Sequence, residues 1–141
     1  MLWTAPNTLL GLGVALAGWV GGARVHWQQR ELAWVVSCWP WGSGGALTLG
    51  NVIVHTGPTL EVVCHTYTHR AGMGEEPCIG LAAHERGHVL QYMALGPLFL
   101  PLYLLCGGIS VRNRFERAAD RYARCGSGWW PWLADQPKVK A

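Results

Sequence analysis

Charged residues are scarce in this chain. Lysine, arginine, aspartate and glutamate make up 13% of its 141 residues, against about 25% in an average soluble domain. This excludes a globally disordered chain, because such chains combine low hydrophobicity with high charge. The net charge is only +3, and no basic patch is interleaved with aromatic residues, so we expect no nucleic-acid partner.

Paired cysteine motifs and internal repeats are also missing. The five cysteines are odd in number and contain no Cys-x-x-Cys spacing, so we expect them to be mostly reduced and buried. No segment recurs at a fixed period, which excludes a repeat architecture. The length fits one domain, which we place at residues 1–126, followed by a loose C-terminal tail over residues 127–141.

Two long segments, residues 1–23 and 92–111, carry no charged side chain. Each is close to the roughly 20 residues that span a bilayer, but glycines interrupt the first segment and Pro97 and Pro101 interrupt the second. The nine tryptophans suit a boundary between apolar and aqueous surroundings. After Val111 there are seven basic and three acidic side chains, so this end would stay on the cytoplasmic side. Two interpretations remain open: contact with a membrane surface, or two buried segments of a compact soluble domain.

Hydrophobic periodicity, turn residues and capping signals predict both helices and strands. We expect helices over residues 7–19, 77–95, 98–105 and 114–124, the last of them capped by Asn113 and ended by Gly126. We expect strands over residues 24–31, 32–39, 47–56 and 60–69, with the last two paired as a hairpin across Gly57 and Pro58. The fold class that follows is α+β, with a small antiparallel sheet.

The strongest motif is His84-Glu85-Arg86-Gly87-His88, an H-E-x-x-H pattern. Its chance expectation is roughly 0.01 per chain of this composition. Residues four apart share one face of a helix, so both imidazoles can reach one ion, and zinc binds neutral imidazole nitrogen well. Glu85 would then take a proton from the metal-bound water. The alternative is an amphipathic helix with two partly buried histidines, but buried polar groups without partners are costly.

A catalytic zinc site needs a third protein ligand and keeps its fourth position for water. Our candidate is Glu116, and Asp120, on the same helix face, would accept the spare N–H of His84 or His88. The alternative is structural, because Asn113 and Glu116 have capping-box spacing and both carboxylates have an arginine at i,i+4 spacing.

Four other residues, Cys64, His65, His69 and Cys78, form a weaker candidate ligand set. Their spacings match no closed zinc-site pattern. His65 and His69 could contact a metal, but we interpret them as polar residues at the edge of a loop. The isolated His26 and His55 lie outside this set, and we interpret them as ordinary residues.

The pattern His84-Glu85-x-x-His88 followed by Glu116-x-x-x-Asp120 resembles the gluzincin branch of zinc metallopeptidases, the thermolysin-like arrangement. The resemblance implies that the two histidines and Glu116 bind Zn²⁺, that Glu85 is the general base, and that Asp120 supports a histidine. The chain also resembles a family of small bacterial zincin-like proteins over most of residues 6–120. The stretches that carry this second resemblance are residues 6–12, 47–50, 84–88, 91–92, 95–101 and 115–117.

We therefore predict a zincin-like minimal domain, in which a small antiparallel sheet packs on the metal-binding helix next to a C-terminal ligand helix. The predicted reaction is hydrolysis of a peptide or protein substrate, held in extended form along residues 47–55 by strand addition. The predicted location is the bacterial cytoplasm or the cytoplasmic face of the inner membrane. Two alternatives are a non-catalytic domain stabilised by zinc and a membrane-bound interaction module. Candidate donors to the oxyanion are Tyr92, Tyr103, Tyr122 and Arg86.

Overall fold

The computed structural model describes residues 3–42, 44–72 and 78–133. In chain order its elements are α1 (Ala5–Val20), β1 (Arg24–Gln28), β2 (Ala33–Ser37), β3 (Ala46–Leu49), β4 (Val52–His55), β5 (Val63–His65), α2 (Tyr67–Arg70), β6 (Cys78–Gly80), α3 (Leu81–Leu95), α4 (Phe99–Leu105) and α5 (Arg114–Cys125). Helices and strands are mixed along the chain, and the predicted α+β class is confirmed.

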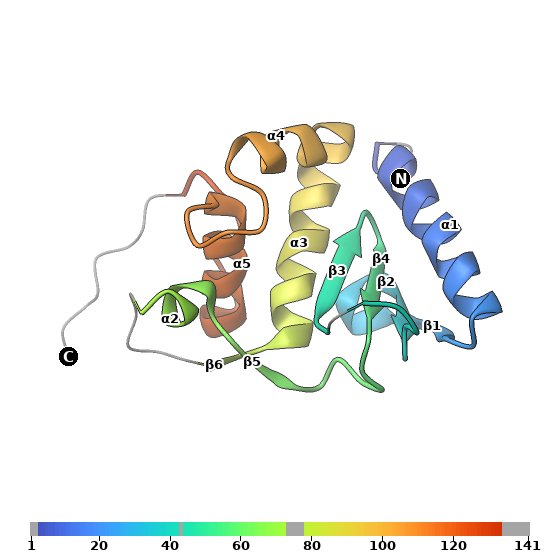
Figure 1. The fold of residues 1–141 in the computed structure, drawn as a ribbon. Coiled ribbons are helices and arrows are strands. Elements are labelled where there is room, and N and C mark those ends of the chain that lie inside the picture. The colour runs from blue at the N-terminus through green and yellow to red at the C-terminus, as the bar shows by residue number, and fades with distance from the viewer. Residues whose placement is uncertain (1–2, 43, 73–77, 134–141) are drawn as a thin grey trace.

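The larger sheet lies between α1 and α3, and α5 packs against the other side of α3 (Figure 1). Successive residues of a strand point to opposite faces, so the sheet has two apolar faces. Val35 and Ile53 pack toward α3, whereas Val36 and Val52 pack toward α1. A third apolar cluster holds α4 against α3 and α5, built on Tyr92, Phe99 and Phe115.

The larger sheet is mixed, so the predicted antiparallel sheet is wrong in part. Its strand order is β1-β2-β4-β3, and β2 and β4 run parallel, with Val35 opposite Ile53. The other two pairings are antiparallel. The reason is that the chain crosses from β2 to the outer position of β3 and then returns between them as β4. As a result β3 is an edge strand, and it lies beside α3.

The single strand predicted over residues 47–56 is instead a hairpin of β3 and β4. Gly50 has φ +61°, a left-handed conformation that glycine adopts without a steric penalty. Gly50 and Asn51 therefore form a two-residue turn, and the amide of Asn51 donates a 3.2 Å hydrogen bond to Oγ1 of Thr8 in α1. Residues 47–55 were predicted to form an edge strand, but only their first half, in β3, lies at the edge of the sheet.

The predicted pairing of residues 47–56 with residues 60–69 does not form. Both edges of β4 are already occupied by β2 and β3, so no free edge remains for the following segment. This segment instead provides β5, which pairs with β6, and then the short α2. Because residues 78–80 form β6, α3 begins at Leu81, later than predicted. Residues 73–77, which include the predicted helix start, lie outside the described residues.

The last helix agrees with its prediction. The side chain of Asn113 accepts a 3.0 Å hydrogen bond from the amide of Phe115, and Gly126 ends α5 with φ +70°. The segment that follows is less loose than expected. Arg121 Nε donates a 2.9 Å hydrogen bond to the carbonyl of Gly128, and Trp132 packs edge-on against Phe115. Residues 134–141 lie outside the described part of the chain.

All five cysteines are unpaired in the structure. None of them is fully buried, so the prediction that they are mostly buried is wrong.

Candidate metal centre

The H-E-x-x-H motif lies in the first half of α3. This helix follows directly on β6 and ends where Gly96, with φ +54°, precedes Pro97, a common way to stop a helix. His84, His88 and Gln91 recur at helical spacing and are all buried. One face of α3 therefore places these polar side chains in the interior, where they need partners.

The close approach of α5 to α3 supplies those partners. A Cβ atom added at Gly87 would lie 3.0 Å from the Cα of Ala119, so the two backbones can meet this closely only beside a glycine. Glu116 and Asp120 flank this contact along α5, and both are buried. The contact brings both carboxylates within reach of His84.

Three ligand atoms form a nearly equilateral triangle. His84 Nε2 lies 3.2 Å from His88 Nε2 and 3.2 Å from Glu116 Oε2. His88 Nε2 lies 3.3 Å from the same carboxylate oxygen. Tetrahedral zinc with bonds of about 2.0–2.1 Å keeps its ligands about 3.3–3.4 Å apart. The donor set therefore has the spacing and chemistry to hold one metal ion.

The remaining polar atoms of both imidazoles have partners that fix how the rings are presented. His84 Nδ1 lies 2.9 Å from Asp120 Oδ1, and His88 Nδ1 lies 2.9 Å from Gln91 Oε1. Gln91 is itself anchored, because its amide nitrogen donates hydrogen bonds to the carbonyls of Phe115 and Trp129. With the N–H groups on the Nδ1 atoms, both Nε2 lone pairs face the triangle.

The electrostatics of the cluster favour a positive charge at the triangle of ligand atoms. Burial lowers the pKa of His84, but the Asp120 and Glu116 carboxylates outweigh it and raise this pKa to about 10. Burial also lowers the pKa of His88, and Glu116 raises it above its ordinary value. Burial raises the pKa of Glu116, but the two imidazoles hold it well below its usual range. Without metal, a bound proton supplies this positive charge, and a divalent cation can replace the proton.

Glu85 lies beside the triangle and is held from the sheet. Thr48 of β3 donates a 2.6 Å hydrogen bond to Glu85 Oε2, and both residues are buried. Glu85 borders the same cavity as His84, His88 and Glu116. The carboxylate is thus next to the donor set but is not one of its three members.

The four candidate oxyanion donors separate into two groups. Tyr103 and Tyr92 border the cavity at the metal centre. The Tyr103 hydroxyl donates a hydrogen bond to Glu116 Oε1, and burial raises the pKa of Tyr92. Arg86 and Tyr122 instead border a cavity on the opposite face of α3, so the structure does not bring them to the centre.

The cavity at the centre has a volume of about 260 Å³. Its floor is the triangle with Glu85, one wall is the edge strand β3, and the other wall is α4 with the loop after it. Most of its lining is apolar, from Ala46, Leu47, Tyr92, Phe99, Leu100, Leu104 and Ile109. An extended chain lying along β3 would have its side chains between apolar walls.

The weaker ligand set lies elsewhere and forms no comparable centre. The rings of His65 and His69 stack with centroids 5.1 Å apart, and Cys78 Sγ lies 4.0 Å from His65 Nδ1. All three residues are exposed, and Cys64 is half-buried. His26 is exposed in β1, and burial lowers the pKa of His55 in β4.

Two residues of the centre were not predicted from the sequence. Gln91 follows His88 by three positions, and this helical spacing was an available signal. Thr48 gave none, because only the pairing of β3 in the sheet places it opposite Glu85.

Comparison of the chain with protein-family models, with curated proteins and with solved structures finds no match. What can be said of its chemistry therefore comes from the geometry of the centre.

Proposed function

We propose that this chain is a zinc-dependent metallopeptidase of the gluzincin type, built on a minimal zincin-like domain. One observation carries the proposal: three buried ligand atoms at tetrahedral spacing lie at the floor of a cavity beside a separate buried carboxylate, Glu85. The donor set of two imidazoles and one carboxylate suits zinc. His84, His88 and Glu116 would hold the ion, and Asp120 and Gln91 would orient the imidazoles.

The ion, when bound, supplies a Lewis acid that lowers the pKa of its water to about 7. Glu85, which borders the same cavity as the three ligands, would act as the general base that accepts a proton from the attacking water and then donates it to the leaving amine. Thr48 holds Oε2 of Glu85, which leaves Oε1 for the proton transfer. The edge strand β3 would bind the substrate backbone, because its outer edge is unpaired in the sheet.

Tyr103 is our candidate for stabilising the oxyanion. Its hydroxyl is already at the metal centre through Glu116, and it lies on α4 at the opposite wall from β3. A phenol at this position can donate a hydrogen bond to a developing negative charge.

A purely structural zinc site would normally be closed by four protein ligands. Among the described residues, the group of potential ligands contains three members, and a cavity opens beside them. Both features favour a catalytic centre over a site that only stabilises the fold.

The test is cleavage of a peptide library by the zinc-loaded chain, with Glu85→Gln as the matched variant. We expect the wild type to cleave and the variant to bind zinc equally well but lose activity by a factor of roughly 10³ or more. A zinc-loaded wild type that cleaves no peptide in the library would overturn the proposed activity. Loss of zinc in Glu85→Gln would contradict the role given to Glu85.

A further inference from the structure

An exposed apolar surface surrounds α4, and we call it the α4 patch. It consists of Trp3, Leu98, Leu104, Leu105 and Ile109, whose exposed fractions are 51%, 53%, 68%, 82% and 72%. Trp3 belongs to this end of the molecule because its Nε1 donates a hydrogen bond to the carbonyl of Ala94 at the end of α3. Single exposed leucines are ordinary, but an apolar group of this kind marks an interaction surface.

The patch has no charged side chain within it, because it draws on two uncharged segments, residues 1–23 and 92–111. Directly after it the chain becomes basic, with Arg112, Arg114 and Arg117 all exposed. Arg114 lies over the ring of Trp132, with its guanidinium carbon 5.7 Å from the ring centroid. An apolar centre is thus bordered by cations and tryptophans.

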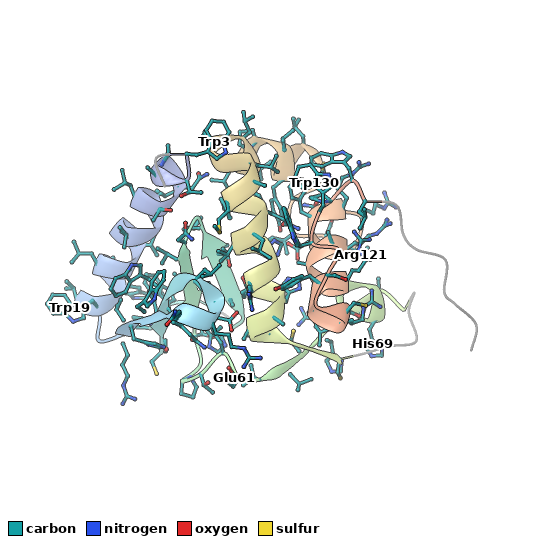
Figure 2. All side chains as sticks on the ribbon, turned by 180° about the vertical axis from the view of Figure 1, so that it is seen from behind. Trp3, Trp19, Glu61, His69, Arg121 and Trp130 are labelled. Atoms are coloured by element: carbon teal, nitrogen blue, oxygen red, sulfur yellow. The ribbon has the colours of Figure 1, made fainter. Side chains whose placement is uncertain are left out.

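In the part of the chain that the structure describes, no exposed acidic side chain lies at this end. Among the described residues Glu61 is the one exposed acidic side chain, and the others are buried. Figure 2 shows Glu61 at the end of the molecule opposite Trp3, whereas Trp130 lies at the same end as Trp3 and α4. The surface around the patch is therefore complementary to a negatively charged partner.

We propose that the α4 patch docks on an anionic lipid bilayer. The leucines and Ile109 would enter the boundary between headgroups and acyl chains, and the tryptophans would lie at the headgroup level. The neighbouring arginines would contact lipid phosphates.

The chain would lie on the membrane and not span it through this region. By length and composition alone, the helical run Leu81–Leu105 is long and apolar enough to cross a bilayer. Its first part is α3, however, which carries buried ionisable residues and is packed between the sheet and α5. Only the α4 end of this run offers an apolar surface to lipid.

Docking of the patch would place the cavity mouth at the membrane surface, because Leu104 and Ile109 belong both to the patch and to the cavity lining. On the proposed peptidase function, on which this step rests, the substrate is a chain segment presented at the membrane surface. The docking itself needs neither metal nor catalysis.

The experiment is flotation of the full chain with vesicles of phosphatidylcholine and phosphatidylglycerol, beside vesicles of phosphatidylcholine alone. We expect the wild type to float with the anionic vesicles, and roughly tenfold less with the neutral ones. The double variant Leu98→Glu/Leu105→Glu should lose flotation while its circular dichroism and metal content stay unchanged. Neither of its positions lines the cavity.

The matched control is Leu9→Glu/Leu16→Glu on the outer face of α1, where both leucines are similarly exposed. It should float like the wild type, and loss of flotation there instead would assign docking to α1 and overturn the proposal. A wild type that stays in solution with both kinds of vesicle would also overturn it.

If the wild type instead stays in solution as a dimer, and Leu98→Glu/Leu105→Glu makes it monomeric, then the patch joins two copies of the chain. Glu85→Gln should float like the wild type, because docking does not depend on catalysis. A wild-type chain that floats but cleaves no peptide would therefore refute the peptidase proposal and leave the docking proposal standing.

Discussion

Thr48 of β3 donates a 2.6 Å hydrogen bond to Oε2 of Glu85 on α3. This bond joins the edge of the sheet to the helix that carries the metal ligands. It holds one carboxylate oxygen of Glu85 and leaves the other for the proposed proton transfer. The strand proposed to bind substrate therefore also orients the proposed general base.

The first prediction concerns this hydrogen bond. Thr48→Val replaces the hydroxyl group with a methyl group of similar size. A hydrogen bond to a charged group contributes about 1.5–3 kcal/mol, so kcat should fall by roughly tenfold or more while the zinc content stays the same. Thr48→Ser keeps the donor and should restore kcat. If both variants lose activity equally, the effect comes from packing and not from the hydrogen bond.

The second prediction concerns Asp120. Its carboxylate orients His84 through Nδ1, and loss of such a partner typically costs 10–100-fold in metal affinity. We expect a loss of about this size for Asp120→Asn in competition with a chelator of known zinc affinity. Asp120→Glu is the charge-retaining comparison. An unchanged affinity in Asp120→Asn would show that the contact with His84 does not support the metal.

The third prediction concerns the contact between α3 and α5. Gly87→Val would introduce three carbon atoms where even one Cβ meets Ala119 at 3.0–3.2 Å, and overpacking of this kind costs about 1–3 kcal/mol. Urea unfolding should show this loss, together with weaker zinc binding as Glu116 moves away. The control is Gly13→Ala in α1, where nothing lies within 4 Å of the added Cβ. That change should stabilise the chain by about 0.5–1 kcal/mol. Equal stability of Gly87→Val and the wild type would contradict the close approach.

The fourth prediction is a pH dependence of the metal-free chain. The pKa of His84 is raised from 6.5 to about 10 in the folded state, so the folded chain holds this proton more tightly than the unfolded one. The stabilisation is fully present below pH 6.5 and is lost as the pH rises through about 10. Urea midpoints should fall across this window, and Asp120→Asn should flatten the curve. Zinc must displace the proton, so its apparent affinity should rise over the same range. Midpoints that do not change between these pH values would contradict the raised pKa.

The residues of the centre that could be predicted are those whose positions depend on nearby sequence. His84, Glu85 and His88 lie within one helical turn and a half, so their spacing alone places them together. Glu116 was predictable because it follows the H-E-x-x-H motif and shares one face of a second helix with Asp120, four residues later. Thr48 was not, because its position opposite Glu85 depends on the order of strands in the sheet.

The strand order itself was the main error of the sequence-based prediction. Alternating apolar residues indicated strands, but the pattern could not show that Gly50 turns the chain in the middle of residues 47–56. Because the turn was not predicted, β4 could not be recognised as an interior strand. An interior strand has no free edge with which residues 60–69 could pair. Helix ends were predicted better, because Gly96 and Gly126 act locally.

The most direct test of the account is the metal content of the purified chain, measured by elemental analysis beside His88→Ala and Glu116→Ala. We predict one zinc ion per chain in the wild type and a large loss in both variants, since each removes one of the three ligands. A wild type that holds no metal even after zinc is supplied would contradict the account. The cluster of His84, His88, Glu116 and Asp120 would then be a buried network of ion pairs without a metal.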